Sequence, residues 1–146
     1  VIGVDIDIRA HNRVEIEKHP MAKRITLIQG SSIDPTIGAQ VRALATGAKR
    51  ILVVLDSNHT HDHVLAELDL YAPLVTKGSY LVVMDTAIDD LPDEFFTDRP
   101  WKKGNSPKSA VHAYLAGNRR FEIDKDIDSK LLLTVAPDGY LKCIAD

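Results

Sequence analysis

The sequence predicts an α/β fold with a doubly wound, mostly parallel sheet, helices on both faces and an antiparallel hairpin at the C-terminal end. Two observations support this prediction. Apolar, β-branched runs typical of buried strands alternate with segments whose apolar residues recur at helical spacing. Near the end of the chain, Asp138-Gly139 separates two short apolar segments, and such a hairpin signal requires at least one antiparallel strand.

The first half of the chain is predicted to hold three strands and two helices. The third strand is an unbroken apolar run, which suits a central position covered on both faces of the sheet. Asp34 is a suitable N-cap with Pro35 at the first helical position, and Gly47 ends the helix that follows. The predicted strands lie at residues 1–8, 24–29 and 51–55, and the predicted helices at 10–18 and 35–46.

The second half continues this alternation and closes with the hairpin. One helix has Val64, Leu68 and Tyr71 on its apolar stripe, and the strand after it ends at Asp85. The stretch 86–106 is predicted as a long surface loop, and loops of this length are often functional. The predicted helices lie at 61–72 and 107–117, and the predicted strands at 79–84, 121–123, 131–135 and 140–144.

The composition narrows the class of protein. A chain of 146 residues with 45% hydrophobic content fits a single domain, residues 1–146, with a substantial core. The net charge of −3 argues against a nucleic-acid partner, and no apolar run approaches the roughly 20 residues needed to cross a membrane. The only cysteine, Cys143, cannot form an internal disulfide, which favours a reducing, cytoplasmic location.

Acidic or small polar residues follow each of the first four predicted strands. In open α/β sheets ligands bind beyond the carboxyl ends of the strands, so these residues are expected at one edge. Asp5 or Asp7, after the first strand, could accept the ribose hydroxyls of an adenosine-type cofactor; the alternative is an ordinary loop acid. The next turn offers either contacts to an adenine or ordinary turn and capping residues. Its residues are Gly30, Ser31, Ser32 and Asp34.

Asp56 and Asp85 end strands that are expected to be neighbours. Two such carboxylates could share a hard cation such as Mg²⁺, and the alternative is two solvated loop acids. His59 is a candidate general base because the pKa of imidazole lies close to physiological pH. His61 and His63 are expected to diverge on the following helix, which argues against a zinc cluster.

Several segments of the chain together resemble one family. VIGVDIDIR, IQGSSIDP, VLDSNHTHDHVLAEL, GSYLVVMDT, PWKKGNSPKSAVHAYL and APDGYLKC are similar to the cephalosporin hydroxylase/rhamnosyl O-methyltransferase family. This family belongs to the class I S-adenosylmethionine-dependent methyltransferases, so the resemblance implies a Rossmann-like fold. The specific part of the resemblance is the combination of DSNHTHDHV with WKKGNSPKSAV.

The resemblance implies a role for each candidate residue. Asp5 matches the ribose-binding acid, while Asp56 and Asp85 match the metal-binding acids, and we also place Asp56 among the cofactor-binding residues. His59 falls where related metal-dependent O-methyltransferases place a catalytic lysine. The turn around the adenine is matched by Gly30, Ser31, Ser32 and Asp34. The chain would start at the second strand of the family fold, so the first strand and its glycine-rich loop are expected to be missing.

The predicted function is S-adenosylmethionine-dependent, metal-assisted O-methyl transfer to a hydroxyl of a small molecule, either a sugar or a secondary metabolite. The cofactors are S-adenosylmethionine and Mg²⁺, and association into a homo-oligomer stays open. One alternative is an inactive nucleotide-binding or oligomerisation module. Another is an NAD-dependent oxidoreductase, which gives no reason for Asp56, His59 and Asp85 to converge. We expect His59 to lie near the loop that carries Trp101, which would stack on an acceptor or anchor the loop.

Overall fold

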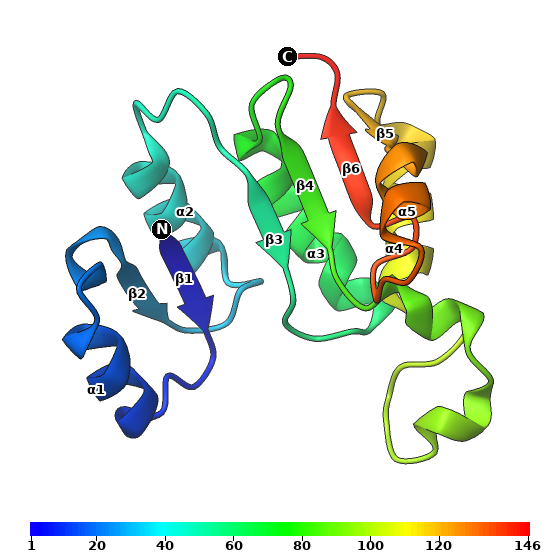
Figure 1. Ribbon diagram of the computed structural model, residues 1–146, viewed down its shortest axis with the longest axis horizontal. Helices are drawn as coiled ribbons and strands as arrows, with labels where there is room; N and C mark the ends of the chain where they lie inside the picture. The colour runs from blue at the N-terminus through cyan, green and yellow to red at the C-terminus, as the bar shows by residue number, and fades with distance from the viewer. The chain divides into compact units, whose positions relative to one another are not determined.

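The computed structural model describes residues 1–146, and the chain divides into two compact units, residues 1–46 and 47–146. Each unit has its own β-sheet, of two and four strands respectively (Figure 1). The single domain predicted over the whole chain stays a prediction. None of the helices combines the length and the apolar character that crossing a bilayer would require.

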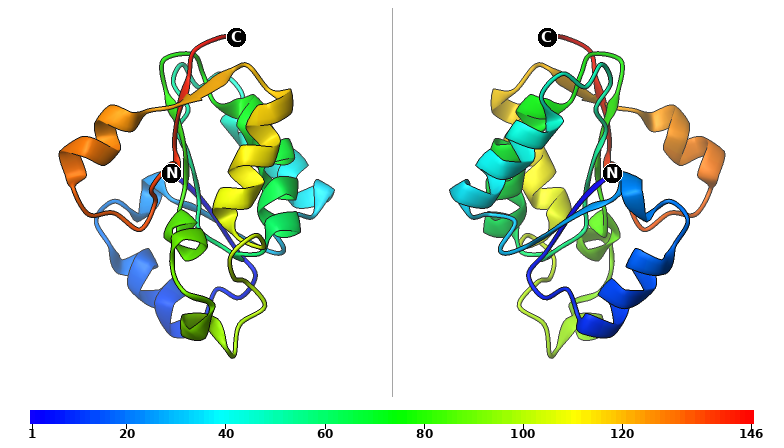
Figure 2. Two further views of the ribbon diagram at one scale, coloured as in Figure 1. Left: turned by 90° about the vertical axis from the view of Figure 1, so that its right-hand side faces the viewer. Right: turned by 90° about the vertical axis from the view of Figure 1, so that its left-hand side faces the viewer.

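Unit 1 is a small α/β layer structure. Its two strands pair in parallel, with Asp5 opposite Gln29 at their carboxyl ends. The helices α1 and α2 lie on opposite sides of this sheet (Figure 2), and α2 buries Ile37 and Val41. The elements are β1 (Ile2–Asp5), α1 (Ala10–Lys18), the 3₁₀ helix η1 (Ala22–Arg24), β2 (Thr26–Gln29) and α2 (Pro35–Ala45).

Unit 2 has a mixed sheet with the strand order β3-β4-β6-β5. β3 and β4 are parallel, whereas β6 runs antiparallel to both of its neighbours. Its strands are β3 (Val53–Leu55), β4 (Tyr80–Val83), β5 (Phe121–Ile123) and β6 (Tyr140–Cys143). Its helices are α3 (His61–Tyr71), α4 (Pro107–Gly117), α5 (Lys125–Leu131) and the 3₁₀ helices η2 (Ala72–Leu74), η3 (Thr86–Asp90) and η4 (Asp93–Phe96).

The core of unit 2 lies between its sheet and the helices α3 and α4, which cover one face while α5 lies on the other (Figure 2). β4 shows the alternation that this arrangement requires, because Leu81 and Val83 are buried and the residues between them are less so. The helices contribute Leu68 and Val111, which are fully buried. Burial of one such side chain stabilises the fold by roughly 1.5–3 kcal/mol.

The structure corrects the prediction at the C-terminal end. Residues 131–135 do not form a strand, so the predicted hairpin across Asp138-Gly139 is wrong. The Asp124 carboxylate accepts a hydrogen bond from the Asp126 N–H and caps α5, and Leu132 ends that helix with a φ of 63°. The antiparallel strand itself is confirmed, because β6 pairs with β4 and β5.

Three further predictions differ from the structure. Within the four-stranded sheet of unit 2 the run 51–55 is not central, because β3 is an edge strand of that sheet. The four-stranded sheet is mixed rather than mostly parallel, since it has one parallel strand pair and two antiparallel pairs, whereas the two-stranded sheet of unit 1 is parallel. The stretch 86–106 contains η3 and η4 and is therefore not a plain loop. The alternating α/β character and the helices on both faces are as predicted.

Candidate active site

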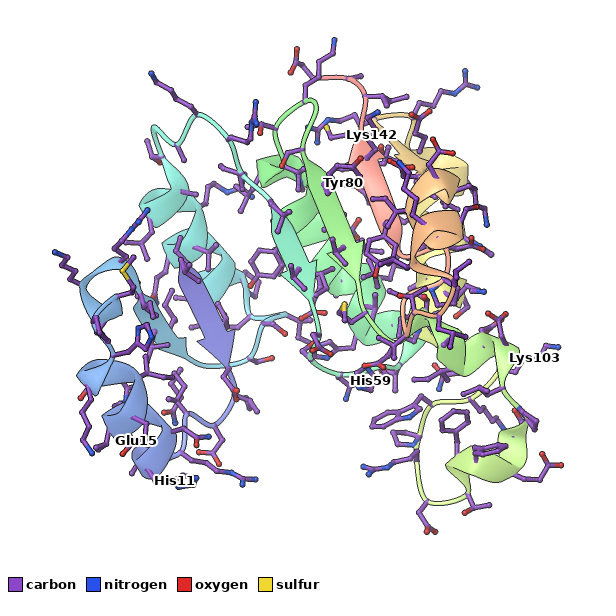
Figure 3. The ribbon with its side chains drawn as sticks, in the orientation of Figure 1. His11, Glu15, His59, Tyr80, Lys103 and Lys142 are labelled. Carbon is purple, nitrogen blue, oxygen red and sulfur yellow. The ribbon has the colours of Figure 1, made fainter.

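Parallel pairing of β3 and β4 brings Asp56 and Asp85 together. Leu55 is the last residue of β3, and its carbonyl oxygen accepts a hydrogen bond from the Met84 N–H at 2.9 Å. The residues that follow therefore leave the same end of the sheet side by side. With His59, the two acids form a cluster whose potential ligand atoms all lie within 4.8 Å of one another. Figure 3 shows His59 beyond the end toward which both strands point.

His59 lies in a short turn between β3 and α3. Its Nε2 is 3.5 Å from Oδ2 of Asp85, and the two side chains are 19% and 36% exposed. The turn is held by Asn58, whose Oδ1 accepts hydrogen bonds from the backbone N–H and the hydroxyl of Thr60 at 2.9 and 2.7 Å. These bonds fix the backbone on both sides of the imidazole.

Asp85 has a left-handed backbone conformation, with φ 55° and ψ 23°. This region is uncommon for residues with a side chain, although aspartate tolerates it better than most, and such residues gather at functional sites. The conformation turns the chain from β4 into η3. Thr86, fully buried, then donates a hydrogen bond to the Pro137 carbonyl oxygen at 2.7 Å and anchors the turn to the segment before β6.

Burial raises the pKa of the Asp85 carboxyl above its ordinary value. The neighbouring His59 lowers this pKa, whereas the Asp56 carboxyl raises it by repulsion between like charges. Two carboxylates that repel one another in this way are stabilised by a shared cation. The electrostatics therefore fit the metal-binding role predicted for Asp56 and Asp85.

Behind the cluster lies a buried polar contact that sequence reasoning missed. The Ser57 hydroxyl donates a hydrogen bond at 2.7 Å to Oε1 of Glu67, a residue only 2% exposed. His63 Nε2 lies 3.2 Å from the Ser57 hydroxyl and 3.7 Å from the same carboxylate oxygen. The available signal was the position of Glu67 on α3, where it shares a stripe with the buried Val64 and Tyr71.

The other two histidines near the cluster diverge, as predicted. His61 Nδ1 lies 2.8 Å from the Ser109 hydroxyl of α4. His63 instead faces Ser57 and Glu67. Their side chains thus contact different partners, so neither belongs to the group formed by Asp56, His59 and Asp85.

The segment after η4 reaches His59 through Trp101. The two rings form an edge-to-face pair with centroids 4.8 Å apart and planes 82° apart. The Arg99 guanidinium lies 5.3 Å from the centroid of the same indole. The predicted proximity of His59 and the Trp101 segment is therefore confirmed.

The cofactor residues predicted in unit 1 lie at the carboxyl ends of β1 and β2. Asp5 Oδ1 accepts a hydrogen bond from the Asp7 N–H at 2.8 Å, and the Gly30 N–H donates to the Asp5 carbonyl oxygen at 2.9 Å. Gly30 packs tightly, since a Cβ there would come within 2.6 Å of Ile37 Cδ1. Asp5 is exposed, so its carboxylate is accessible to a ligand.

The turn after Gly30 has a clear structural role. Asp34 Oδ1 accepts a hydrogen bond from the Thr36 N–H at 2.7 Å, and its own N–H donates to the Ser31 carbonyl oxygen at 3.0 Å. Asp34 is thus the N-cap of α2, as one of the two sequence interpretations had it. Contacts of Ser31, Ser32 and Asp34 with an adenine stay a prediction.

The fold and the site define an α/β protein with two acids and a histidine gathered at the carboxyl edge of its sheet. Residues 1–144 match the family model described as Rhamnosyl O-methyltransferase/CmcI, and the chain belongs to this family. The predicted family is therefore confirmed.

Curated relatives come from mycobacteria. Proteins named Rhamnosyl O-methyltransferase from Mycobacterium tuberculosis (strain H37Rv) and Mycobacterium bovis (strain BCG / Pasteur 1173P2) are 34% identical, over 84% of this chain and 49% of each relative. The protein of that name from Mycobacterium leprae is 33% identical, over 97% of this chain and 58% of the relative. The chain thus spans about half the length of the curated relatives that it matches.

Solved structures of similar fold include the MycE methyltransferase from the mycinamycin biosynthetic pathway. Its complex with Mg, SAH and mycinamycin VI superimposes with a TM-score of 0.50 and 19% identity. The match covers 78% of this chain and 27% of the MycE chain. At this level of identity the likeness shows a shared α/β fold.

Proposed function

We propose that this protein is part of an S-adenosylmethionine-dependent O-methyltransferase that uses a divalent cation and methylates a hydroxyl of a small molecule, such as a sugar. The single observation behind the proposal is the cluster of Asp56, His59 and Asp85, whose potential ligand atoms lie within 4.8 Å of one another. Membership of the rhamnosyl O-methyltransferase/CmcI family supports it. The MycE structure, solved with Mg and SAH, supports a cation and this cofactor class for the fold.

The donor set fits Mg²⁺. Magnesium prefers hard oxygen ligands and keeps several waters, so two carboxylates at one edge suit it better than a cage of protein ligands. The raised pKa of Asp85 adds to the fit, because a cation would offset both its burial and its repulsion by Asp56. Asp56 and Asp85 would hold the cation, which orients an acceptor hydroxyl and lowers its pKa when bound.

His59 would accept the proton of the acceptor hydroxyl. The carboxylate of Asp85 near Nε2 favours a proton on that nitrogen, which leaves the Nδ1 lone pair free to act as the base. S-adenosylmethionine, held through Asp5, would supply an electrophilic methyl group for the acceptor oxygen and would leave as S-adenosylhomocysteine. His59 would hold the proton that the acceptor hydroxyl loses.

Unit 1 would bind the adenosine part of the cofactor. Asp5 ends β1 with an exposed carboxylate, and an acid at such a strand end can accept ribose hydroxyl hydrogen bonds. Gly30 begins the next turn. Ser31, Ser32 and Asp34 of this turn would contact the adenine, as the sequence predicts.

A methyl-transfer assay tests the proposal. The full-length protein is incubated with S-adenosylmethionine, Mg²⁺ and a panel of glycosides that includes rhamnosides, and products are analysed by mass spectrometry. We expect an acceptor to gain one methyl group, with formation of S-adenosylhomocysteine.

His59→Ala should reduce turnover by roughly 10²–10⁴-fold, the usual contribution of a general base. His112→Ala, which changes an exposed histidine of α4, is the matched control. Turnover of His59→Ala near that of the control would remove His59 from the mechanism.

A further inference from the structure

The imidazole of His59 is held on two sides by residues from different elements. Asp85 Oδ2 lies 3.5 Å from its Nε2, and the indole of Trp101 meets the ring edge-to-face at 4.8 Å between centroids. A carboxylate at one nitrogen leaves the ring free to rotate about that contact. A flat aromatic surface at right angles removes this freedom, so the two contacts together fix the direction of the second nitrogen.

Asn105 connects the Trp101 segment to the chain just after His59. Its Oδ1 accepts a hydrogen bond from the backbone N–H of His61 at 2.9 Å. Its Nδ2 donates to the carbonyl oxygen of Pro100, the residue before Trp101, at 2.8 Å. One side chain thus binds the backbone beside both members of the aromatic pair.

The turn that presents Asn105 is anchored separately. Lys102 and Asn105 exchange backbone hydrogen bonds of 3.1 and 2.9 Å around Gly104, which has a φ of 79°. Asp89 Oδ1 accepts hydrogen bonds from the Gly104 N–H at 2.7 Å and from the Ser106 hydroxyl at 2.6 Å. The Asn105 amide therefore projects from a turn that is held by its own hydrogen bonds.

We propose that Trp101 is a positioning residue for His59 and that Asn105 sets the distance between them. The inference rests on the proposed function, in which His59 is the base. Trp101 would act by orienting the imidazole and not by binding the cofactor or the cation. The competing role for Trp101 is to cover the surface of the segment, and in that case its removal would not act through His59.

Kinetics in two backgrounds separate these roles. Trp101→Ala should lower kcat by about two- to tenfold, which corresponds to the free energy of one aromatic pair. Trp101→Phe should lower kcat by less. The affinity for S-adenosylmethionine and the Mg²⁺ dependence should not change. In a His59→Ala background the same Trp101 substitution should have no further effect, because contacting residues are coupled. Equal effects in both backgrounds would overturn the proposal.

The matched control is Phe95→Ala. Phe95 lies on η4 of the same segment and is 71% exposed, so its removal should leave kcat unchanged. Asn105→Ala should reproduce the loss of kcat seen for Trp101→Ala. Asn105→Asp keeps the acceptor for the His61 N–H but loses the donor to the Pro100 carbonyl, and we expect an intermediate loss. Wild-type kcat in Asn105→Ala would contradict the role of this residue.

Fluorescence provides a readout that does not depend on activity. Trp101 is the only tryptophan of residues 1–146, so the indole emission of this chain reports on the contact. His59→Ala and Asn105→Ala should each change the emission, whereas His112→Ala should not. Unchanged emission in His59→Ala would refute the contact itself.

The outcomes also separate this inference from the proposed function. Normal turnover in His59→Ala removes the base and with it the proposed mechanism. Strong loss in His59→Ala together with wild-type kcat in Trp101→Ala leaves the mechanism intact and overturns only the positioning role. Since Trp101→Phe retains an aromatic ring, it keeps the test valid if Trp101→Ala fails to fold.

Discussion

The carboxylate of Asp85 lies 3.5 Å from His59, although the two residues leave different strands of the sheet. Their contact follows from the parallel pairing of β3 and β4, which also places Asp56 beside them. If Asp85 holds a cation as proposed, its contact with His59 joins the two roles that the proposed reaction requires.

Removal of one cation ligand should lower metal affinity before it affects the fold. Asp85→Asn and Asp56→Asn each remove one negative charge from the cluster and keep the size of the side chain. We expect higher Mg²⁺ concentrations to be needed for half-maximal turnover, and chelation by EDTA to abolish turnover of the wild type. Asp62→Asn, on the exposed side of α3, is the control. Equal Mg²⁺ requirements in Asp85→Asn and the control would exclude Asp85 as a ligand.

The convergence of these acids could be predicted from the sequence because it depends on local order. Parallel strands end at one edge, so acids that follow neighbouring strands meet there wherever the strands are placed correctly. The same rule placed His59 near them through its short spacing from Asp56. The contact between His59 and Trp101 could be expected only as a proximity, since its geometry depends on the hydrogen bond that the His61 N–H donates to Oδ1 of Asn105, which lies in a distant segment.

Other features were beyond sequence reasoning for physical reasons. The run 131–135 is apolar and β-branched at its end, so it resembles a strand, yet its Leu133 is 92% exposed. The capped helix α5 takes up the preceding residues, and β6 pairs with β5 instead. Glu67 was missed because charged residues are rarely buried without a partner, and its partner Ser57 lies on another element.

Glu67 should be sensitive to truncation and tolerant of neutralisation. Glu67→Ala leaves a cavity and deprives the Ser57 hydroxyl of its acceptor, so the free energy of unfolding should fall by about 2–4 kcal/mol. Glu67→Gln keeps that acceptor and removes a buried charge whose second oxygen, Oε2, has no hydrogen-bond partner. The free energy of unfolding should therefore fall by less in Glu67→Gln than in Glu67→Ala. Chemical denaturation of both variants measures this, and equal losses would contradict the account.

Asp89 should stabilise unit 2 in a pH-dependent way. Burial raises the pKa of its carboxyl, but the hydrogen bonds from the Ser106 hydroxyl and the Gly104 N–H outweigh burial, so the pKa lies below its ordinary value. Stability from such a group is present above the ordinary aspartate pKa and is lost as pH falls through the lowered one.

Asp89→Asn should therefore unfold more easily than the wild type at pH near 7, by about 1 kcal/mol after allowance for solvent screening. The difference should shrink as the pH falls below about 4, where the wild-type carboxyl also begins to lose its charge. Asp98→Asn, an exposed acid of the same segment, is the control. Thermal unfolding across this pH range measures the difference, and a gap that widens in acid would be inconsistent with this role.

Gly139 should not tolerate a side chain. A Cβ at this position would lie 2.1 Å from the Val83 carbonyl oxygen, a backbone atom that can move only by displacing β4 from its neighbour. Gly139→Ala should therefore lower the melting temperature and disturb the turn that carries Asp85. Gly117→Ala is the matched control, because nothing lies within 4 Å of a Cβ there. The prediction fails if both variants melt at the wild-type temperature.

Calorimetric titration of the full-length protein with S-adenosylmethionine, S-adenosylhomocysteine and NAD tests the central claim most directly. A methyltransferase of this family should bind the first two ligands, and Asp5→Ala should weaken both because it removes the acid assigned to the ribose hydroxyls. NAD should give no comparable heat. Binding of NAD without any signal for the two methyl-cycle ligands would contradict the assignment and favour an oxidoreductase.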